Sequence, residues 1–299
     1  MSKIAFVFPG QGSQYVGMAK DLYDSSKEFM DSANNAIGFS LTDIMFNGPM
    51  DSLKQTDITQ PAIFLHSISI LNKIKNIKPD MVAGHSLGEY SALVAAGVLN
   101  PIDGLKIVRT RGEAMLQAGI ELPGTMAAIV GLEANQVDKI CQEVSQTDVV
   151  QSANFNSPGQ VVISGSINGV KRAMELAKER GAKLVKELVV SGAFHSPLMA
   201  SAKLKLQQKL NETEFNDAIV PVYTNVTAKP VVSKDEISKL LFDQLSSPVR
   251  WEETIENMIA DGATKFYEIG PGKVLQGLIK RIDKNVEVFG IDSLSDLKN

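Results

Sequence analysis

The 299-residue sequence predicts an α/β protein with a parallel main sheet, into which a small module is inserted. Up to residue 124, short apolar runs typical of buried strands alternate with helical segments, an order that implies parallel pairing. From residue 125 the order changes, because two strands follow each other directly, and the first order returns after residue 190. We therefore expect two structural units in one chain.

The segment before residue 124 contains two predicted strands. KIAFVF (3–8) is a compact apolar run that leads into the glycine-rich stretch PGQGSQ (9–14), which indicates a buried strand ending in a loop. Residues 58–74, with Pro61 near their start, predict a mostly buried helix. DMVAG (80–84) predicts a second strand, and the small side chains of 86–99 predict a helix that packs close to the sheet.

Residues 125–190 predict a small domain of their own. Its elements are expected at strand 125–131, helix 134–145, strand 148–155, strand 160–166, helix 168–181 and strand 182–188. This β-α-β-β-α-β order is the split pattern of a ferredoxin-like module. We expect this module to be inserted into a larger domain that comprises residues 1–124 and 191–299.

The remainder of the larger domain returns to mixed helices and strands. Its elements are expected to be a helix over 200–210, an apolar segment 218–226, two helical stretches around 242–259, a strand 265–270 and a helix after the turn at 271–273. No tandem repeat and no low-complexity segment occurs.

Composition excludes several classes of function. The 30 basic and 34 acidic residues give a net charge of −4, which is not the electrostatic footprint of a nucleic-acid-binding protein. A single cysteine cannot form an intramolecular disulfide, and three histidines without a Cys/His cluster offer no metal-ligand spacing. No run approaches the roughly 18 apolar residues of a membrane helix, and the N-terminal apolar run is too short for a signal peptide. We expect a cytoplasmic enzyme without a metal site.

The pentapeptide GHSLG (84–88) places Ser86 between a predicted strand and a predicted helix. This context is typical of a nucleophile elbow, in which flanking glycines let the backbones of a tight turn approach each other. The alternative is that Gly84 and Gly88 flank a serine by chance, but the strand before and the helix after favour the nucleophile.

A serine nucleophile needs a base, and histidine is the usual one near neutral pH. His66 lies in an apolar helical stretch, which favours a structural role, and His85 directly precedes Ser86, so its side chain should point elsewhere. His195, in the predicted loop after the inserted module, is the remaining candidate base, although a histidine on a surface loop is the alternative.

The sequence marks no acid that would orient this histidine, but a backbone carbonyl can orient an imidazole as well. Arg111 has two interpretations of equal weight, an ordinary exposed charge or a bidentate clamp on a substrate carboxylate. The loop 9–14 lacks the Gly-Lys-Ser/Thr ending of a P-loop and the glycine spacing of a dinucleotide fingerprint. We expect it to offer Gln11 and backbone N–H groups to an oxyanion.

Six separated motifs resemble, in family order, the malonyl-CoA:acyl carrier protein transacylases of bacterial fatty acid synthesis. They are FPGQGSQYVGM, TQPAIF, GHSLGEYSAL, RGEAM, AFHSPLM and GPGKVLQGLIKR, and the likeness covers residues 4 to 282. The acyltransferase domains of polyketide synthases are similar too. The resemblance implies a hydrolase-like α/β domain with a ferredoxin-like insert, in agreement with the order of predicted elements.

The resemblance also implies roles for single residues. Ser86 matches the acylated serine and His195 its general base; Gln11 and the backbone N–H of Leu87 match the oxyanion hole. Arg111 matches the residue that pairs with the malonyl carboxylate, and Gln244 the residue whose main-chain carbonyl holds the histidine.

The function implied is transfer of a malonyl group from malonyl-CoA to the phosphopantetheine thiol of acyl carrier protein, with no cofactor and no nucleic-acid or membrane partner. The resemblance favours a monomer. An acidic carrier predicts a basic docking surface, for which we expect Lys273, Lys280, Arg281 and Lys284, although a solvated helix face is the alternative. Three alternatives for the function are an acyltransferase that loads polyketide synthase carriers, a serine esterase or thioesterase, and a noncatalytic carrier-binding protein.

Overall fold

Strand β1 (Lys3–Phe8) lies inside a six-stranded sheet of the computed structural model, which describes residues 2–298. The strand order is β10-β9-β1-β2-β7-β8, with β2 at Met81–Gly84, β7 at Val222–Tyr223, β8 at Pro230–Val231, β9 at Ala263–Ile269 and β10 at Glu287–Ile291. All neighbours pair in parallel except β7 and β8. The predicted parallel sheet of an α/β protein is therefore confirmed.

The two faces of this sheet bury different residues of the same strands. Phe6 and Phe8 of β1 belong to a large core cluster, whereas Ala5 and Val7 belong to a second cluster that includes Trp251. This follows from the alternation of side chains along a strand. Helices therefore cover both faces of the sheet, and the sequences of its buried strands are continuous apolar runs.

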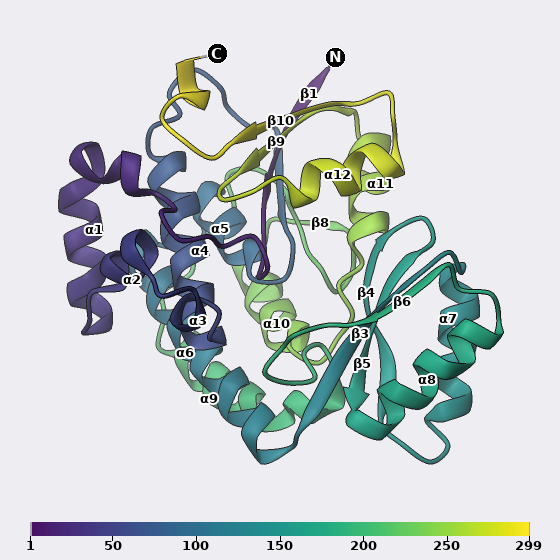
Figure 1. Ribbon diagram of the computed structural model, residues 1–299. Coiled ribbons are helices and arrows are strands. Elements are labelled where there is room, and N and C mark those ends of the chain that lie inside the picture. The colour runs from purple at the N-terminus through teal and green to yellow at the C-terminus, as the bar shows by residue number, and fades with distance from the viewer. Residues whose placement is uncertain (1, 299) are drawn as a thin grey trace.

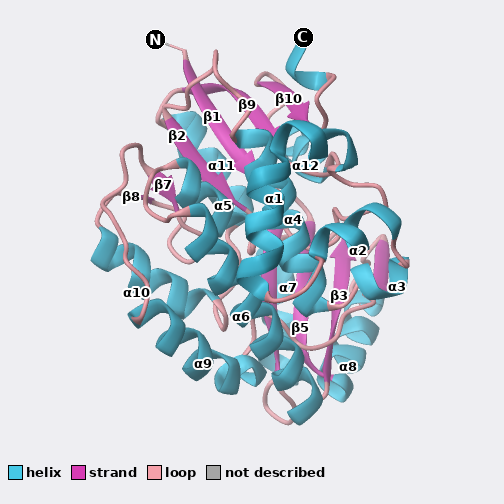
Figure 2. Cartoon of the chain, turned by 90° about the vertical axis from the view of Figure 1, so that its left-hand side faces the viewer, coloured by secondary structure: helices cyan, strands magenta, loops and turns pink. Residues whose placement is uncertain are grey.

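Three helices build the layer against the first face: α4 (Thr56–Leu71), α5 (Gly88–Ala95) and α6 (Pro101–Glu121). The other face packs on α11 (Trp251–Ala260) and α12 (Val274–Ile282). The periphery is formed by α1 (Tyr23–Ile37), α2 (Leu41–Asn47), α3 (Met50–Leu53), α9 (Ala200–Asn211), α10 (Lys234–Gln244) and the short 3-10 helices Lys20–Leu22, Pro197–Met199 and Asp296–Lys298. In the view of Figure 2, α1 lies toward the viewer.

The second sheet and its two helices are formed by the segment from residue 124 on, for which the sequence predicts two strands in direct succession. Its elements are β3 (Gly124–Val130), α7 (Ala134–Val144), β4 (Val150–Ser157), β5 (Gln160–Ser166), α8 (Ile167–Glu179) and β6 (Leu184–Glu187). The four strands are antiparallel in the order β4-β5-β3-β6, and Figure 1 shows this sheet beside the first one with α7 and α8 on its outer side. The β-α-β-β-α-β order agrees with the prediction, whereas the domain limits of 125–190 stay a prediction.

Strand β4 also joins the two sheets through one residue of the larger unit. Val249 forms a parallel bridge with Asn154, its N–H donates to the carbonyl of Ala153 at 2.8 Å, and its carbonyl accepts from the N–H of Phe155 at 2.9 Å. The loop before Val249, which contains Ser246 and Ser247, is therefore held against the small sheet.

Some elements have no counterpart in the sequence prediction. Helices α1 to α3 and strand β10 were not predicted, and Arg111 lies inside α6. None of the helices in the described part of the chain has the length and apolar character of a membrane span. Within residues 2–298, no three His, Cys, Asp or Glu side chains are grouped so as to hold a metal ion.

Candidate active site

Ser86 lies on a sharp turn between β2 and α5, with a φ of 51° that is rare for a residue other than glycine. The flanking glycines make this turn sterically feasible. A Cβ atom on Gly84 would lie 1.9 Å from the carbonyl carbon of Gly88, and one on Gly88 would lie 2.0 Å from the carbonyl oxygen of Phe8. Both glycines are thus required by close backbone contacts, so the pattern around Ser86 is not accidental.

His195 contacts the serine directly. Its Nε2 lies 2.8 Å from Ser86 Oγ, and its Nδ1 lies 2.9 Å from the carbonyl oxygen of Gln244 and 3.1 Å from that of Ser247. Because carbonyl oxygens only accept hydrogen bonds, Nδ1 carries the proton and Nε2 is free to accept one from the hydroxyl. The structure therefore supplies two backbone carbonyls where a triad has an acid.

The imidazole is held neutral by its surroundings. Burial, and then the positive charge of Arg111, lower the pKa of His195 to about 3. A neutral ring keeps its lone pair available near physiological pH, which is the state that a general base needs before the reaction.

Gln151 of β4 holds the backbone on both sides of this histidine. Its Nε2 donates to the carbonyl oxygen of His195 at 2.7 Å and to that of Ser246 at 3.2 Å. His195 has a φ of 55°, so its backbone is in the left-handed region that non-glycine residues seldom adopt. The side-chain amide of Gln151 thus stabilises both His195 and the loop whose carbonyls accept a hydrogen bond from the imidazole.

Arg111 is buried, with only 1% of its surface exposed, so its interpretation as an ordinary exposed charge is wrong. Its guanidinium donates to Gln60 Oε1 at 2.7 Å, to Ser86 Oγ at 3.0 Å and to Gln244 Oε1 at 3.1 Å, and it lies 5.6 Å from the ring centre of Tyr90. All three acceptors are neutral groups. A buried cation beside the serine hydroxyl can bind an anionic group of a substrate.

Glu89, a carboxyl residue that the sequence prediction did not assign, lies buried behind this arginine. Its Oε2 accepts from Gln244 Nε2 and from the backbone N–H of Asn225, both at 2.9 Å. Burial raises the pKa of Glu89 to about 7, although the two hydrogen bonds and Arg111 act in the opposite direction. The sequence does contain a signal for this residue, because Glu89 is the one charged residue in the otherwise uncharged helical stretch 86–99.

Asn225 completes the support of the turn. Its Oδ1 accepts from the backbone N–H of Ser86 at 2.7 Å, and its Nδ2 donates to the carbonyl of Gly84 at 2.6 Å. Gln244 Nε2 also donates to the carbonyl of Ser86 at 3.1 Å. The backbone of the nucleophile turn is therefore tied to two side chains far away in sequence.

Gln11 and Leu87 lie beside Ser86 along one cavity. Gln11 Nε2 donates to Thr56 Oγ1 at 3.3 Å, and Leu87 is the N-cap residue of α5, at the end of the helix where the first backbone N–H groups have no acceptor within the helix. The cavity has a volume of about 240 Å³. Both structural units line it, with Met126, Asn154, Gln160 and Val162 from the small sheet and Val274, Leu275 and Leu278 from the start of α12.

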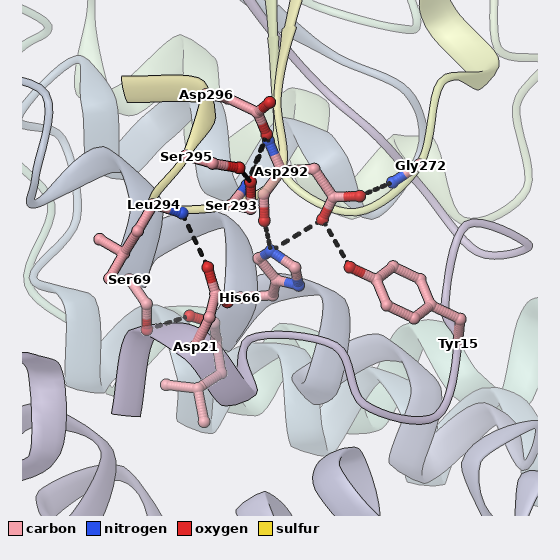
Figure 3. Close-up of polar contacts among 11 residues, drawn as sticks. Tyr15, Asp21, His66, Ser69, Gly272, Asp292, Ser293, Leu294, Ser295 and Asp296 are labelled. Carbon is pink, nitrogen blue, oxygen red and sulfur yellow. Dashed lines mark hydrogen bonds and ion pairs between the residues drawn. The ribbon is translucent and has the colours of Figure 1, made fainter. Parts of the chain in front are cut away.

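The other two histidines have other partners. His85 is buried, its Nε2 lies 2.8 Å from Asn156 Oδ1, and its ring packs 5.5 Å from that of Trp251. His66 Nε2 lies 2.7 Å from the carbonyl oxygen of Asp292. Figure 3 shows His66 on one side of the Asp292 carboxylate and Tyr15 on the other. Neither ring contacts the serine hydroxyl, as expected from the sequence.

The four basic residues expected at a docking surface are all exposed, but two of them have contacts of their own. Lys280 Nζ donates to the carbonyl oxygen of Val286 at 2.6 Å, and Arg281 donates to Gln160 Oε1 at 2.5 Å. Since Gln160 lines the cavity, Arg281 lies close to its rim. Lys280 instead holds the end of α12 to the following loop, so the docking surface stays a prediction.

Comparisons with known proteins show the family of this chain. The family described as the acyl transferase domain matches residues 5–291. The malonyl CoA-acyl carrier protein transacylase of Bacillus subtilis is 48% identical over 297 residues, which cover 97% of this chain and 94% of that protein. That of Staphylococcus aureus strain MRSA252 is 45% identical and covers 100% and 98%.

Solved structures give the same result. The crystal structure of an acyl carrier protein S-malonyltransferase from Vibrio cholerae superimposes with a TM-score of 0.95 at 44% identity and covers 99% of both chains. A type II polyketide synthase acyl-carrier protein in complex with its malonyl-transacylase matches with a TM-score of 0.94 at 40% identity, covering 99% of this chain and 98% of that one. This chain therefore belongs to the acyl transferase family, and its relatives there include malonyl CoA-acyl carrier protein transacylases.

Proposed function

We propose that this protein transfers a malonyl group from malonyl-CoA to the phosphopantetheine thiol of an acyl carrier protein and thereby supplies fatty acid elongation. The observation that carries the proposal is the buried Arg111 guanidinium 3.0 Å from a serine hydroxyl that is itself 2.8 Å from a neutral imidazole. A nucleophile and a base alone fit many acyl-transfer reactions, whereas the adjacent cation selects an acyl group with a carboxylate. The names of the relatives support the same substrate.

In the first half-reaction, Ser86 Oγ attacks the thioester carbonyl carbon while His195 Nε2 takes the hydroxyl proton. The oxyanion that forms is stabilised by the backbone N–H of Leu87 and by Gln11. The carbon–sulfur bond then breaks, His195 returns the proton to the CoA thiolate, and a malonyl ester remains on Ser86.

In the second half-reaction the carrier thiol takes the place of CoA. His195 accepts its proton, the sulfur attacks the ester, and the bond to Ser86 Oγ breaks as the proton returns to the serine. The carbonyls of Gln244 and Ser247 stabilise the imidazolium that forms in each half. His195 mediates every proton transfer, so the reaction as written uses no cofactor. Malonyl-CoA takes part as a substrate.

Intact-protein mass spectrometry after exposure to malonyl-CoA tests the proposal. The wild-type protein should gain the mass of one malonyl group and lose it when a holo carrier protein is added. Ser86→Ala should gain nothing, and a malonyl adduct on that variant would show that the nucleophile is a different residue. A wild-type protein that never gains the mass would instead support the noncatalytic carrier-binding alternative.

The same measurement separates a transferase from a thioesterase, because a thioesterase would lose the malonyl mass to water without a carrier. The match to a complex with a polyketide carrier makes the choice of carrier a question for kinetics. Rates of transfer to a fatty acid carrier and to a polyketide carrier, measured side by side, should favour the fatty acid carrier. The monomeric state and the cytoplasmic location stay predictions.

A further inference from the structure

Glu89 occupies an unusual position for a buried carboxyl group. It is fully buried on α5, and both of its hydrogen bonds end on the same oxygen, Oε2, which accepts from Gln244 Nε2 and from the N–H of Asn225. The other oxygen, Oε1, has no hydrogen-bond partner among the described residues. A proton on Oε1 would therefore leave both hydrogen bonds intact, so the site accommodates the charged and the neutral form with the same geometry.

Gln244 connects this carboxyl group to Arg111. The Nε2 of its amide faces Glu89 at 2.9 Å, and its Oε1 accepts from Arg111 Nη2 at 3.1 Å. Because Glu89 only accepts while ionised, it orients the amide so that the oxygen faces the guanidinium. The negative charge of Glu89 also partly offsets the buried positive charge of Arg111, whose three direct acceptors are neutral.

We infer that Glu89 makes the preference for acyl groups that carry a carboxylate depend on pH, by taking up a proton when such a carboxylate binds to Arg111. The inference rests on the proposed function. A malonyl carboxylate on Arg111 brings a second negative charge next to a carboxyl group that water does not reach. The charge balance of the empty site, one cation with one anion, is restored when Glu89 becomes neutral.

The other titratable groups around Glu89 keep one charge state near neutral pH. Tyr90, next to it on α5, has its pKa raised by burial and stays neutral. His195, which contacts the main-chain carbonyl of Gln244, has its pKa lowered to about 3, and burial also lowers the pKa of His85, so both rings stay neutral. Arg111 on α6 remains the cation. Glu89, with a pKa raised by burial to about 7, is thus the group of this cluster that changes charge in the working range.

The direction of the pH dependence follows from linkage. Malonyl binding raises the pKa of Glu89 further, so binding takes up protons, and the affinity for malonyl groups is highest below the pKa of the free enzyme. As pH rises through about 7, ionised Glu89 competes with the substrate for Arg111, and the affinity falls. Acetyl groups carry no such charge, so the ratio of malonyl to acetyl specificity should fall with rising pH. Contributions from His195 and from the CoA moiety cancel in that ratio.

Proton uptake can be measured directly. Ser86→Ala should bind malonyl-CoA without turnover, and calorimetric titrations in buffers of different ionisation enthalpy then give the number of protons taken up. At pH 7.5 we expect malonyl-CoA to cause an uptake of roughly half a proton more than acetyl-CoA does. Adding Glu89→Gln, which keeps an oxygen acceptor for both hydrogen bonds, should abolish the difference. Equal uptake with the two ligands would overturn the inference, and this readout does not depend on the Gln variant folding.

Kinetics provide the second readout. For the wild type, the ratio of malonyl to acetyl kcat/KM should fall at least about threefold between pH 6 and pH 8.5, whereas in Glu89→Gln it should be high and independent of pH. Glu268→Gln is the matched control, because Glu268 is also buried with a pKa near 7 but binds the start of α12 instead of the Arg111 network. It should keep the wild-type pH dependence. If malonyl-CoA loads Ser86 but Glu89→Gln shows that same dependence, the inference fails while the proposed function stands.

Discussion

Replacing Arg111 by alanine tests the substrate preference most directly. In the structure the guanidinium is buried and presents both terminal nitrogens to the site, so a bound carboxylate would form a bidentate, water-excluded pair. Removing one partner of a buried charge pair costs about 3–5 kcal/mol, and each 1.4 kcal/mol is about tenfold in rate or affinity. Malonyl kcat/KM in Arg111→Ala should therefore fall by about 10²- to 4 × 10³-fold.

Acetyl transfer serves as the internal reference for this variant. Arg111 also donates to Gln60, Gln244 and Ser86, and losing these bonds disturbs the site equally for every acyl group. Acetyl kcat/KM should fall less than malonyl kcat/KM, because the acetyl group has no carboxylate that loses its partner. The lost hydrogen bonds, each contributing about 0.5–1.5 kcal/mol or up to about 3 with a charged donor, lower both values alike. Loading of radiolabelled malonyl-CoA and acetyl-CoA measures both.

Arg111→Lys is the matched control for charge. Lysine keeps the positive charge but cannot reproduce the fork, so it should restore part of the malonyl preference and leave it below wild type. An unchanged ratio of malonyl to acetyl loading in Arg111→Ala would refute the assignment of this residue as the carboxylate clamp. In that case the cation would serve only to polarise the serine hydroxyl.

Three further predictions concern the support of His195, the turn at Ser86 and the predicted docking surface. Gln151→Leu should lower kcat by about tenfold with little change in KM, because two carbonyls around His195 lose their donor; steady-state kinetics measures the split. Gly88→Ala should yield little folded protein, since its Cβ would lie 2.0 Å from a carbonyl oxygen, whereas Gly277→Ala on α12 meets nothing within 4 Å and should raise the free energy of unfolding by about 0.5–1 kcal/mol in denaturant titrations. Arg281→Glu should raise the KM for an acidic carrier severalfold without changing the loading rate from malonyl-CoA, and an unaltered KM would exclude this part of the predicted docking surface.

Much of the fold was predictable because its signals are local. The apolar run 3–8 and the stretch 80–84 became the adjacent strands β1 and β2, and the order of strands and helices between residues 124 and 187 was correct. The helices before residue 54 were not predicted, since α1 and α2 cover the core with only a few buried residues each and therefore lack a continuous apolar run. Strand β10 is half exposed at the sheet edge and gives an equally weak pattern.

For the site, what could be predicted depends on whether a residue acts through its side chain or through its main chain. Ser86 was recognisable from the glycines on both sides of it, and His195 could be found by elimination among three histidines, whereas only the family resemblance distinguished the two interpretations of Arg111. Ser247 has no such signal, since it contributes a main-chain carbonyl that every residue possesses. Gln151 acts from the other sheet, and only the folded chain shows that its amide reaches the histidine.

Glu89 shows why a charged residue inside an apolar helix calls for a partner. A carboxylate without one would be expelled from a buried position or would become neutral. Here its partner is the buried Arg111, and the contact between the two passes through the amide of Gln244. On the inference above, the balance of these two charges changes each time an acyl group with a carboxylate binds. A buried carboxyl group that changes its charge between two steps needs one oxygen that is free to take up the proton. The Oε1 of Glu89, which has no hydrogen-bond partner among the described residues, meets that requirement.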